Sequence, residues 1–157
     1  MDKSNLKDFF DNAKQVSKPD LERLSVETHD EVFKRTDCLS CGNCCKTAPP
    51  IVTPADVKRI ARFLGKSPKQ IIRNFTIQDF NGEMSFDQVP CRFLRDDNYC
   101  SIYEARPEAC GDYPHTRSNQ FMRRKNLHIK NFEICPAVEE IITIMENKIK
   151  EQGLDNV

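Results

Sequence analysis

The first third of the chain carries apolar residues at the spacing of one helix face. Over residues 3–16 these positions are Leu6, Phe9, Phe10, Ala13 and Val16. A helix-start signal follows at residues 17–20, and the face then continues to about residue 35 through Leu21, Leu24, Thr28 and Val32. The pattern predicts two helices in residues 1–36. We interpret them as an arm that packs on the rest of the chain; a helix pair that docks a partner protein is the alternative.

Three further helices have start signals or strong apolar faces. Thr53 supplies an N-cap, Pro54 suits the first helical position, and Gly65 suits the end of that helix. Residues 67–70 form a capping-box pattern that predicts a short helix. Its inward-facing residues are expected to be Ile71, Ile72 and Phe75. The last helix is predicted over residues 136–151 by the apolar face of Val138, Ile141, Ile142, Met145 and Ile149.

The segments between these helices are irregular. Residues 37–50 contain Gly, Asn and two prolines, which predict a loop. Short extended runs on both sides of residues 81–82, and again around residues 96–98, predict small hairpins. We therefore predict an α+β fold, mostly α, in which helices and a few short strands surround a cysteine-ligated metal centre. Residues 1–36 would form the helical arm, and residues 37–157 the cysteine-rich metal-binding domain.

Composition limits both the core and the partners. Only 38% of the 157 residues are hydrophobic and there is no Trp, so the eight cysteines are candidates to support a thin core. The 24 basic and 24 acidic residues cancel, which does not indicate a nucleic acid or an anionic membrane as partner. The sequence has neither the apolar run of a signal peptide nor a membrane span. We expect a cytoplasmic protein whose cysteines bind metal or carry redox chemistry.

Four of the eight cysteines lie in the run from Cys38 to Cys45. Its Cys-x2-Cys-x2-Cys spacing is the one with which bacterial ferredoxins supply three cluster ligands, together with a Cys-Pro pair such as Cys135-Pro136. Gly42 permits a positive φ and a close approach of backbone N–H groups to sulfur. We predict metal ligands among Cys38, Cys41, Cys44, Cys45, Cys91, Cys100, Cys110 and Cys135. Zinc and iron–sulfur clusters both accept four sulfurs, so the spacing leaves the metal open.

The adjacency of Cys44 and Cys45 bears on the number of centres. Neighbouring side chains of an extended segment point to opposite faces, so two adjacent thiolates fit one ion poorly. Two four-thiolate centres, or one centre and a reactive set of thiols, follow from this argument. One partition groups Cys38, Cys41 and Cys44 with a remote cysteine and leaves Cys45 with the downstream thiols. The sequence does not choose between them.

Charged groups near the cysteines suggest further chemistry. A helical turn that opens at Pro107 would place Cys110 in its first turn, where the helix dipole is expected to lower the thiol pKa. Lys46, Arg92 and Arg106 adjoin cysteines and could offset thiolate charge. Residues 117–130 carry five basic side chains and no acid, which predicts a solvated loop; a face for an anionic partner is the alternative.

These motifs together resemble the CxxCxxCC family, also called YkgJ-type zinc- or iron-chelating domains, a group that includes flagellin N-methylase. The matching pieces are Cys38 to Cys45, Pro90 to Leu94, Cys100 to Tyr103, Arg106 to Cys110, Tyr113-Pro114 and Cys135-Pro136. The resemblance implies a bacterial cytoplasmic protein that binds an iron–sulfur cluster or zinc through these cysteines. It also raises protein lysine methylation as an activity. The chain lacks a Gly-rich strand-to-helix turn for a methyl-donor nucleotide and the Cys-x3-Cys-x2-Cys spacing of radical S-adenosylmethionine enzymes.

We therefore expect a metal-binding protein with an iron–sulfur centre, favoured over zinc, in a redox role or a role in protein modification. One alternative is a zinc-stabilised binding module without catalysis, which would meet a protein partner through its N-terminal helices or residues 117–130. A second alternative is a metal-free thiol-redox protein that uses Cys44 and Cys45. The sequence identifies neither a catalytic residue nor a substrate.

Overall fold

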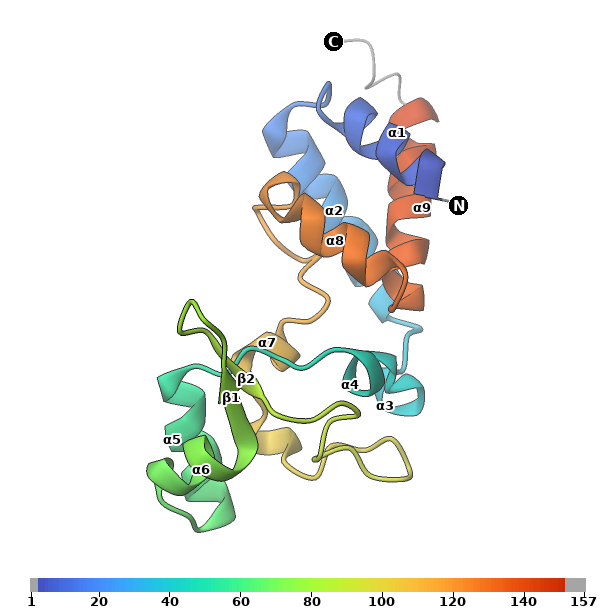
Figure 1. Cartoon of the computed structure of the whole chain (residues 1–157). Coiled ribbons are helices and arrows are strands. Elements are labelled where there is room, and N and C mark those ends of the chain that lie inside the picture. The colour runs from blue at the N-terminus through green and yellow to red at the C-terminus, as the bar shows by residue number, and fades with distance from the viewer. Residues whose placement is uncertain (1–2, 152–157) are drawn as a thin grey trace. The chain divides into compact units, whose positions relative to one another are not determined.

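A computed structural model describes residues 3–151 and divides them into two compact units (Figure 1). The helical unit combines the chain up to Thr36 with the chain from Pro114, and the cysteine unit is Asp37–Tyr113. The chain thus passes between units after residue 36 and again after residue 113, and the predicted domains 1–36 and 37–157 stay a prediction. The predicted ranges 1–36 and 37–157 also include residues 1, 2 and 152–157, which lie outside the described part.

The predicted α+β class, mostly α, is confirmed. The helical unit is built from α1 (Lys3–Ala13), α2 (Lys18–Phe33), α8 (Lys125–Phe132) and α9 (Pro136–Glu151), with a 3₁₀ turn at Met122–Arg124. The helices α1, α2 and α9 agree with the sequence pattern, and the Ser17 side chain caps α2 by accepting from the Asp20 N–H. None of the helices in residues 3–151 has the length and apolar character needed to cross a bilayer.

The prediction of a solvated loop over residues 117–130 is wrong for residues 122–130, which form the 3₁₀ turn and the first part of α8. The apolar periodicity of α8 is weak because both of its buried residues, His128 and Asn131, are polar. Asn131 is held by a hydrogen bond from its Nδ2 to the Pro114 carbonyl at 3.3 Å. Tertiary contacts of this kind, rather than an apolar stripe, stabilise the helix in place.

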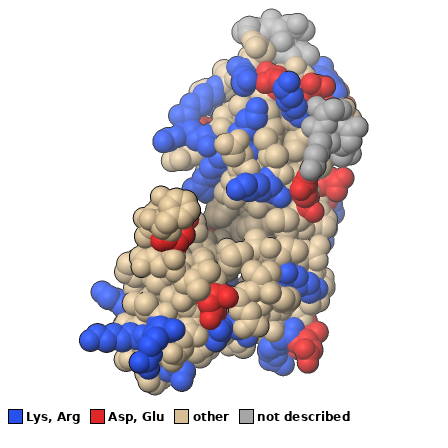
Figure 2. All heavy atoms as spheres, viewed as in Figure 1, with Lys and Arg blue, Asp and Glu red and all other residues tan. Residues whose placement is uncertain are grey.

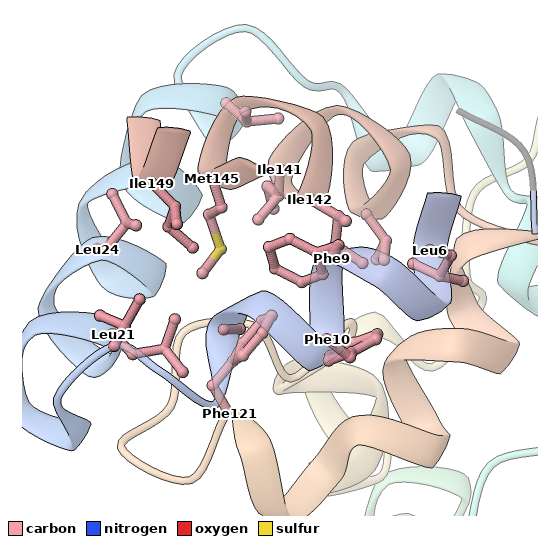
Figure 3. Packing of buried hydrophobic residues seen from close by; sticks show 14 of the residues in the cluster. Leu6, Phe9, Phe10, Leu21, Leu24, Phe121, Ile141, Ile142, Met145 and Ile149 are labelled. Atoms are coloured by element: carbon pink, nitrogen blue, oxygen red, sulfur yellow. The ribbon is translucent and has the colours of Figure 1, made fainter. Parts of the chain in front are cut away.

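The helical unit has a conventional apolar core (Figure 3). The aromatic rings of Phe9, Phe10 and Phe121 pack together, with centroids 4.9 to 6.3 Å apart. The α9 residues Ile141 and Ile142 are completely buried in the same cluster. Fifteen buried apolar residues belong to this core among the described residues, so it does not depend on the cysteine run.

His128 gives this core a dependence on pH. It is completely buried and stacks on Phe121 at 4.4 Å between centroids. Burial, followed by the charges of His115 and Arg124, lowers the pKa of His128 to about 4, against an ordinary value of 6.5. The unfolded chain therefore takes up a proton that the folded chain excludes when the pH falls from 6.5 to 4. We expect the free energy of unfolding to be unaffected above pH 6.5 and to fall by roughly 3 kcal/mol across that window.

The matched comparison is the variant His128→Leu. Urea unfolding of the wild type and of the variant at several pH values between 6.5 and 4 should show a smaller loss of stability in the variant. The carboxylates titrate in both proteins, so their contribution to the pH dependence cancels when the unfolding free energies of the two proteins are subtracted. Equal pH dependence in the two proteins would contradict a buried, neutral His128.

The cysteine unit consists of short elements around one two-stranded antiparallel sheet. They are α3 (Cys38–Cys41), α4 (Asn43–Thr47), α5 (Pro54–Leu64), α6 (Pro68–Phe75), β1 (Thr76–Gln78), β2 (Met84–Phe86), a 3₁₀ turn at Tyr103–Ala105, and α7 (Glu108–Gly111). The predicted capping of α5 and α6 and the hairpin of β1 and β2, with Ile77 opposite Ser85, are confirmed. Val52 joins this sheet by donating its N–H to the Met84 carbonyl at 2.8 Å.

One predicted core position of α6 is wrong. Ile71 is completely buried, whereas Ile72 is 48% exposed. Ile71 and Phe75 are four residues apart and share a helix face, and Ile72 lies one position further around the helix. The core of this unit contains nine buried apolar residues, and Cys91 and Cys100 pack against it.

Candidate metal centre

The cysteine run from Cys38 to Cys45 forms two short helices, which corrects the predicted loop. The Asp37 side chain accepts from the Leu39 N–H and caps α3, and Gly42 at φ 62° ends α3 and begins α4. Helices of four and five residues are too short for apolar periodicity, so only these capping residues could have predicted them.

Cys44 and Cys45 consequently lie on a helix rather than on an extended strand. Their Sγ atoms are 4.0 Å apart. The argument that adjacent thiols must face opposite ways assumed an extended segment, and that assumption is wrong here. The number of metal centres therefore stays open.

Backbone contacts join this run to the downstream cysteines. The Cys91 N–H donates to the Cys45 carbonyl at 2.7 Å. A tight turn follows, in which the Leu94 N–H donates to the Cys91 carbonyl at 2.9 Å. Leu94 then pairs with Cys100 as an antiparallel bridge, which agrees with the small hairpin predicted around residues 96–98. These contacts bring the backbones of Cys45, Cys91 and Cys100 together.

The third downstream thiol is that of Cys110, on α7. Burial, followed by the charges of Cys45, Cys91 and Cys100, raises the pKa of Cys110 to about 12. The predicted lowering of this pKa by a helix N-terminus is therefore wrong. α7 has a single turn, and its small dipole is outweighed by loss of water and by three neighbouring thiolates.

Cys45 differs from Cys110 in the direction of its pKa shift. A hydrogen bond with Cys44, and the nearby charge of Lys46, lower the pKa of Cys45 to about 7. Arg106 lowers the pKa of Cys100 and of Cys110, although burial raises both on balance. Arg92 instead forms an ion pair with Asp87 at 2.6 Å. Two of the three predicted basic neighbours, Lys46 and Arg106, thus lower the pKa of a cysteine thiol.

Backbone N–H groups are directed at two of the sulfurs. The N–H groups of Phe93 and Leu94 donate to the Cys91 sulfur, and that of Ile102 donates to the Cys100 sulfur. Each of these hydrogen bonds lowers the pKa of its thiol against the larger effect of burial. Such N–H donors stabilise thiolates and are among the groups that tune sulfur-bound metal centres.

Seven cysteines lie in the cysteine unit, and the eighth, Cys135, lies in the helical unit, partly buried against its core. All eight are within the described residues, and none forms a disulfide. Within residues 3–151 no three Cys, His, Asp or Glu side chains are arranged so that they could hold a metal ion as they stand. The donor chemistry fits a thiolate-bound metal, and the ligand roles of the individual cysteines stay predictions.

A sequence model of one protein family matches residues 37–136, a span that includes all eight cysteines. The chain belongs to the CxxCxxCC family. The family is described as a zinc- or iron-chelating domain, which supports metal binding by this chain without selecting the metal. The match leaves out α1, α2 and all but the first residue of α9, so the CxxCxxCC domain includes the whole cysteine unit and only part of the helical unit. No curated protein and no solved structure matches the chain.

Asp56 supports the CxxCxxCC domain in a way that sequence analysis missed. It is 1% exposed, and its Oδ1 accepts from the Glu108 N–H at 3.0 Å and from Arg59 at 2.5 Å. Arg59 also donates to the Arg106 carbonyl at 2.6 Å. Although burial raises it, these bonds and those from Thr53 hold the pKa of Asp56 below its usual value. Asp56 therefore anchors the segment that carries Cys110. The sequence indicated only an acid in the first turn of a helix, because the contact with Glu108 spans 52 positions.

Gly42 supports the cysteine run itself. A Cβ added at Gly42 would lie 3.2 Å from the Cβ and Oδ1 of Asn98, whose Nδ2 donates to the Ser40 carbonyl at 2.9 Å. We expect Gly42→Ala to destabilise the domain by about 1–2 kcal/mol through its φ alone, and by more through displacement of Asn98.

Gly65→Ala is the matched control for this prediction. Gly65 has φ 64° but no atom within 4 Å of the added Cβ. Urea unfolding should show the larger loss for Gly42→Ala, and metal titration should show weaker binding for that variant alone. Equal effects of the two substitutions would refute a role for the contact between Gly42 and Asn98.

Proposed function

We propose that the CxxCxxCC domain holds an iron–sulfur centre that serves electron transfer or assists a protein-modifying reaction. The observation that carries the proposal is a group of four half-buried thiols whose charges interact, on Cys45, Cys91, Cys100 and Cys110. An iron–sulfur centre would supply one-electron chemistry to this site. The residues of the chain provide the sulfur donors, exclude water in part, and direct N–H groups at the sulfurs of Cys91 and Cys100.

The electrostatics of the thiols favour a bound cation. Burial, and after it the charges of neighbouring thiolates, raise the pKa values of Cys91, Cys100 and Cys110. The pKa of Cys45 is lowered, by its hydrogen bond with Cys44 and by the charge of Lys46, and Arg106 offsets only part of the rise at Cys100 and Cys110. A metal cation would remove the repulsion and keep the thiols deprotonated at neutral pH.

Anaerobic purification followed by elemental analysis and a visible spectrum tests this proposal. We expect iron and acid-labile sulfide in the protein, and a brown colour that bleaches on reduction or on exposure to oxygen. Stoichiometric zinc with neither iron nor sulfide would overturn the iron–sulfur proposal.

A zinc-stabilised binding module is the second candidate, and the small core of the cysteine unit favours it. Nine buried apolar residues form that core, against fifteen in the helical unit. Small domains with thin cores are commonly held together by structural zinc. This candidate predicts a colourless protein with tightly bound zinc.

A metal-free thiol-redox protein is the third candidate. The 4.0 Å contact between the sulfurs of Cys44 and Cys45 favours it, since two adjacent thiols are available for oxidation. It predicts reversible thiol titration of a protein that contains no metal after anaerobic purification.

A protein is the partner that the surface charge favours. Arg117, in the basic segment of residues 117–130, forms an ion pair with Asp30 at 2.8 Å, so the positive charge of the segment is partly offset. Basic and acidic side chains are interspersed on the face shown in Figure 2. A nucleic-acid surface would carry a larger basic patch. Salt-dependent binding of the purified protein to RNA or DNA would contradict this part of the proposal.

A further inference from the structure

We propose that α5 and α6 form a docking face for an acidic region of a partner protein. The inference rests on the proposal that the partner is a protein, and it does not depend on the metal. Residues 57–78 contain six of the 24 basic residues of the chain and no acid. The six are Lys58, Arg59, Arg62, Lys66, Lys69 and Arg73. In Figure 2, Lys and Arg side chains gather at the lower left, over the helices that Figure 1 labels α5 and α6.

Most of this charge is not neutralised within the domain. Arg59 forms an ion pair with the buried Asp56 at 2.5 Å. The other five side chains are exposed, and none of them belongs to an ion pair within residues 3–151. Arg73 donates from its Nε to a neutral acceptor, the Asn74 Oδ1, at 3.4 Å. Uncompensated positive charges on one face attract an acidic surface and speed its encounter.

The spacing of these charges works against helix stability. Lys58 and Arg62 are four residues apart in α5, and Lys69 and Arg73 are four residues apart in α6. Like charges at that spacing lie on the same side of a helix and repel each other. Lys69 also lies in the first turn of α6, where the helix dipole disfavours a cation. Helix stability therefore does not explain this arrangement, whereas binding of an acidic partner does.

Two exposed apolar side chains accompany the charges. Phe63 in α5 is 50% exposed and Ile72 in α6 is 48% exposed, and each adjoins a basic residue in the sequence. The opposite sides of the two helices are completely buried at Ile60 and Ile71, in one core cluster. Apolar anchors surrounded by a charged rim are typical of protein–protein interfaces.

Other anionic partners fit this face less well. A helix that lies in a bilayer surface inserts its apolar face into the lipid, but α5 and α6 direct theirs into the core of the cysteine unit. Proteins that bind nucleic acid combine a strong basic patch with aromatic side chains that stack on bases. The net charge of this chain is zero, and Phe63 is the exposed aromatic residue among residues 54–75.

Binding of a synthetic acidic peptide to the full-length protein tests the proposal. The peptide is built from Glu, Asp, Leu and Phe, and its binding, measured by fluorescence anisotropy, should weaken as salt is added. The variant carries Lys58→Glu and Lys69→Glu together. We expect it to bind the peptide at least about tenfold more weakly. Its urea midpoint should equal or exceed that of the wild type, because each new glutamate lies four residues before an arginine.

The matched control carries Arg123→Glu and Lys130→Glu, two exposed positions of the helical unit. It makes the same change in net charge and should bind the peptide as the wild type does. Equal weakening in the two variants would overturn the docking face, since overall charge would then explain the binding. A wild-type protein that does not bind the peptide would overturn it as well.

RNA of random sequence, and vesicles of phosphatidylserine and phosphatidylcholine, are the competing probes. Binding of either one that is lost in the variant with Lys58→Glu and Lys69→Glu would overturn the assignment of this face to a protein. The metal content should be the same in the wild type and both variants. A protein that lacks iron but binds the peptide at this face would overturn the iron–sulfur proposal and leave the docking face in place.

Discussion

Removal of the metal is expected to unfold the cysteine unit while the helical unit stays folded. The two units differ in what stabilises them. The helical unit has fifteen buried apolar residues that include three aromatic side chains, and the cysteine unit has nine, with Cys91 and Cys100 packed at their edge. Structural zinc in small domains contributes an apparent binding free energy of roughly 10–16 kcal/mol, which exceeds the stability of most domains of this size.

Hydrogen exchange resolved by segment measures this effect. After complete chelation, the amides of α5 and of the hairpin β1–β2 should lose protection, whereas those of α2 and α9 should keep it. Addition of the metal should restore the protection. Unchanged exchange throughout Asp37–Tyr113 in verified metal-free protein would contradict a structural role for the metal.

Loss of the Asp56 side chain should cause the second-largest loss of folding stability, after removal of the metal. Asp56 and Arg59 form an ion pair at 2.5 Å in which the carboxylate is buried, and the same carboxylate accepts from the Glu108 N–H. Asp56→Ala leaves that N–H without its acceptor and Arg59 without its partner. Breaking such a network costs about 3–5 kcal/mol, and we expect the free energy of unfolding to fall by that amount.

Asp20→Ala is a matched control in the same protein. Asp20 also follows a helix N-cap, Ser17, and it also pairs with an arginine three residues later, Arg23, at 2.7 Å. Its side chain is 37% exposed, whereas that of Asp56 is 1% exposed. Urea unfolding should show a loss of less than about 1 kcal/mol for the Asp20 ion pair in addition to its capping effect. Metal affinity should fall only in Asp56→Ala, because only Asp56 holds the Cys110 segment. Equal losses in the two variants would show that burial of the Asp56 network contributes nothing.

Local signals in the sequence predicted most of the regular elements. The N-cap at Thr53 and the capping pair Ser67–Gln70 occur as expected, and α9 has the predicted bounds. These predictions succeeded because caps and apolar faces act within one or two turns. The two helices of the cysteine run were missed because they are little longer than one helical turn, so an apolar face cannot repeat along them. The helix α8 was missed because its buried residues, His128 and Asn131, are polar.

The candidate site depended on contacts that local patterns do not contain. The sequence indicated which residue type would hold a metal, and the family match over residues 37–136 supports it. It could not show that Cys45 bonds to Cys91 through the backbone, or that Asp56 reaches Glu108. The predicted pKa of Cys110 was wrong for the same reason, because the neighbouring thiols come from other segments.

X-ray absorption at the edge of the bound metal tests the central claim most directly, since it reports the atoms bonded to that metal. The protein should be purified without oxygen, and its metal identified by elemental analysis. We predict a first shell of sulfur alone, with four sulfurs at about 2.3 Å from the metal. A first shell dominated by nitrogen or oxygen would contradict a centre held by the cysteines of this chain.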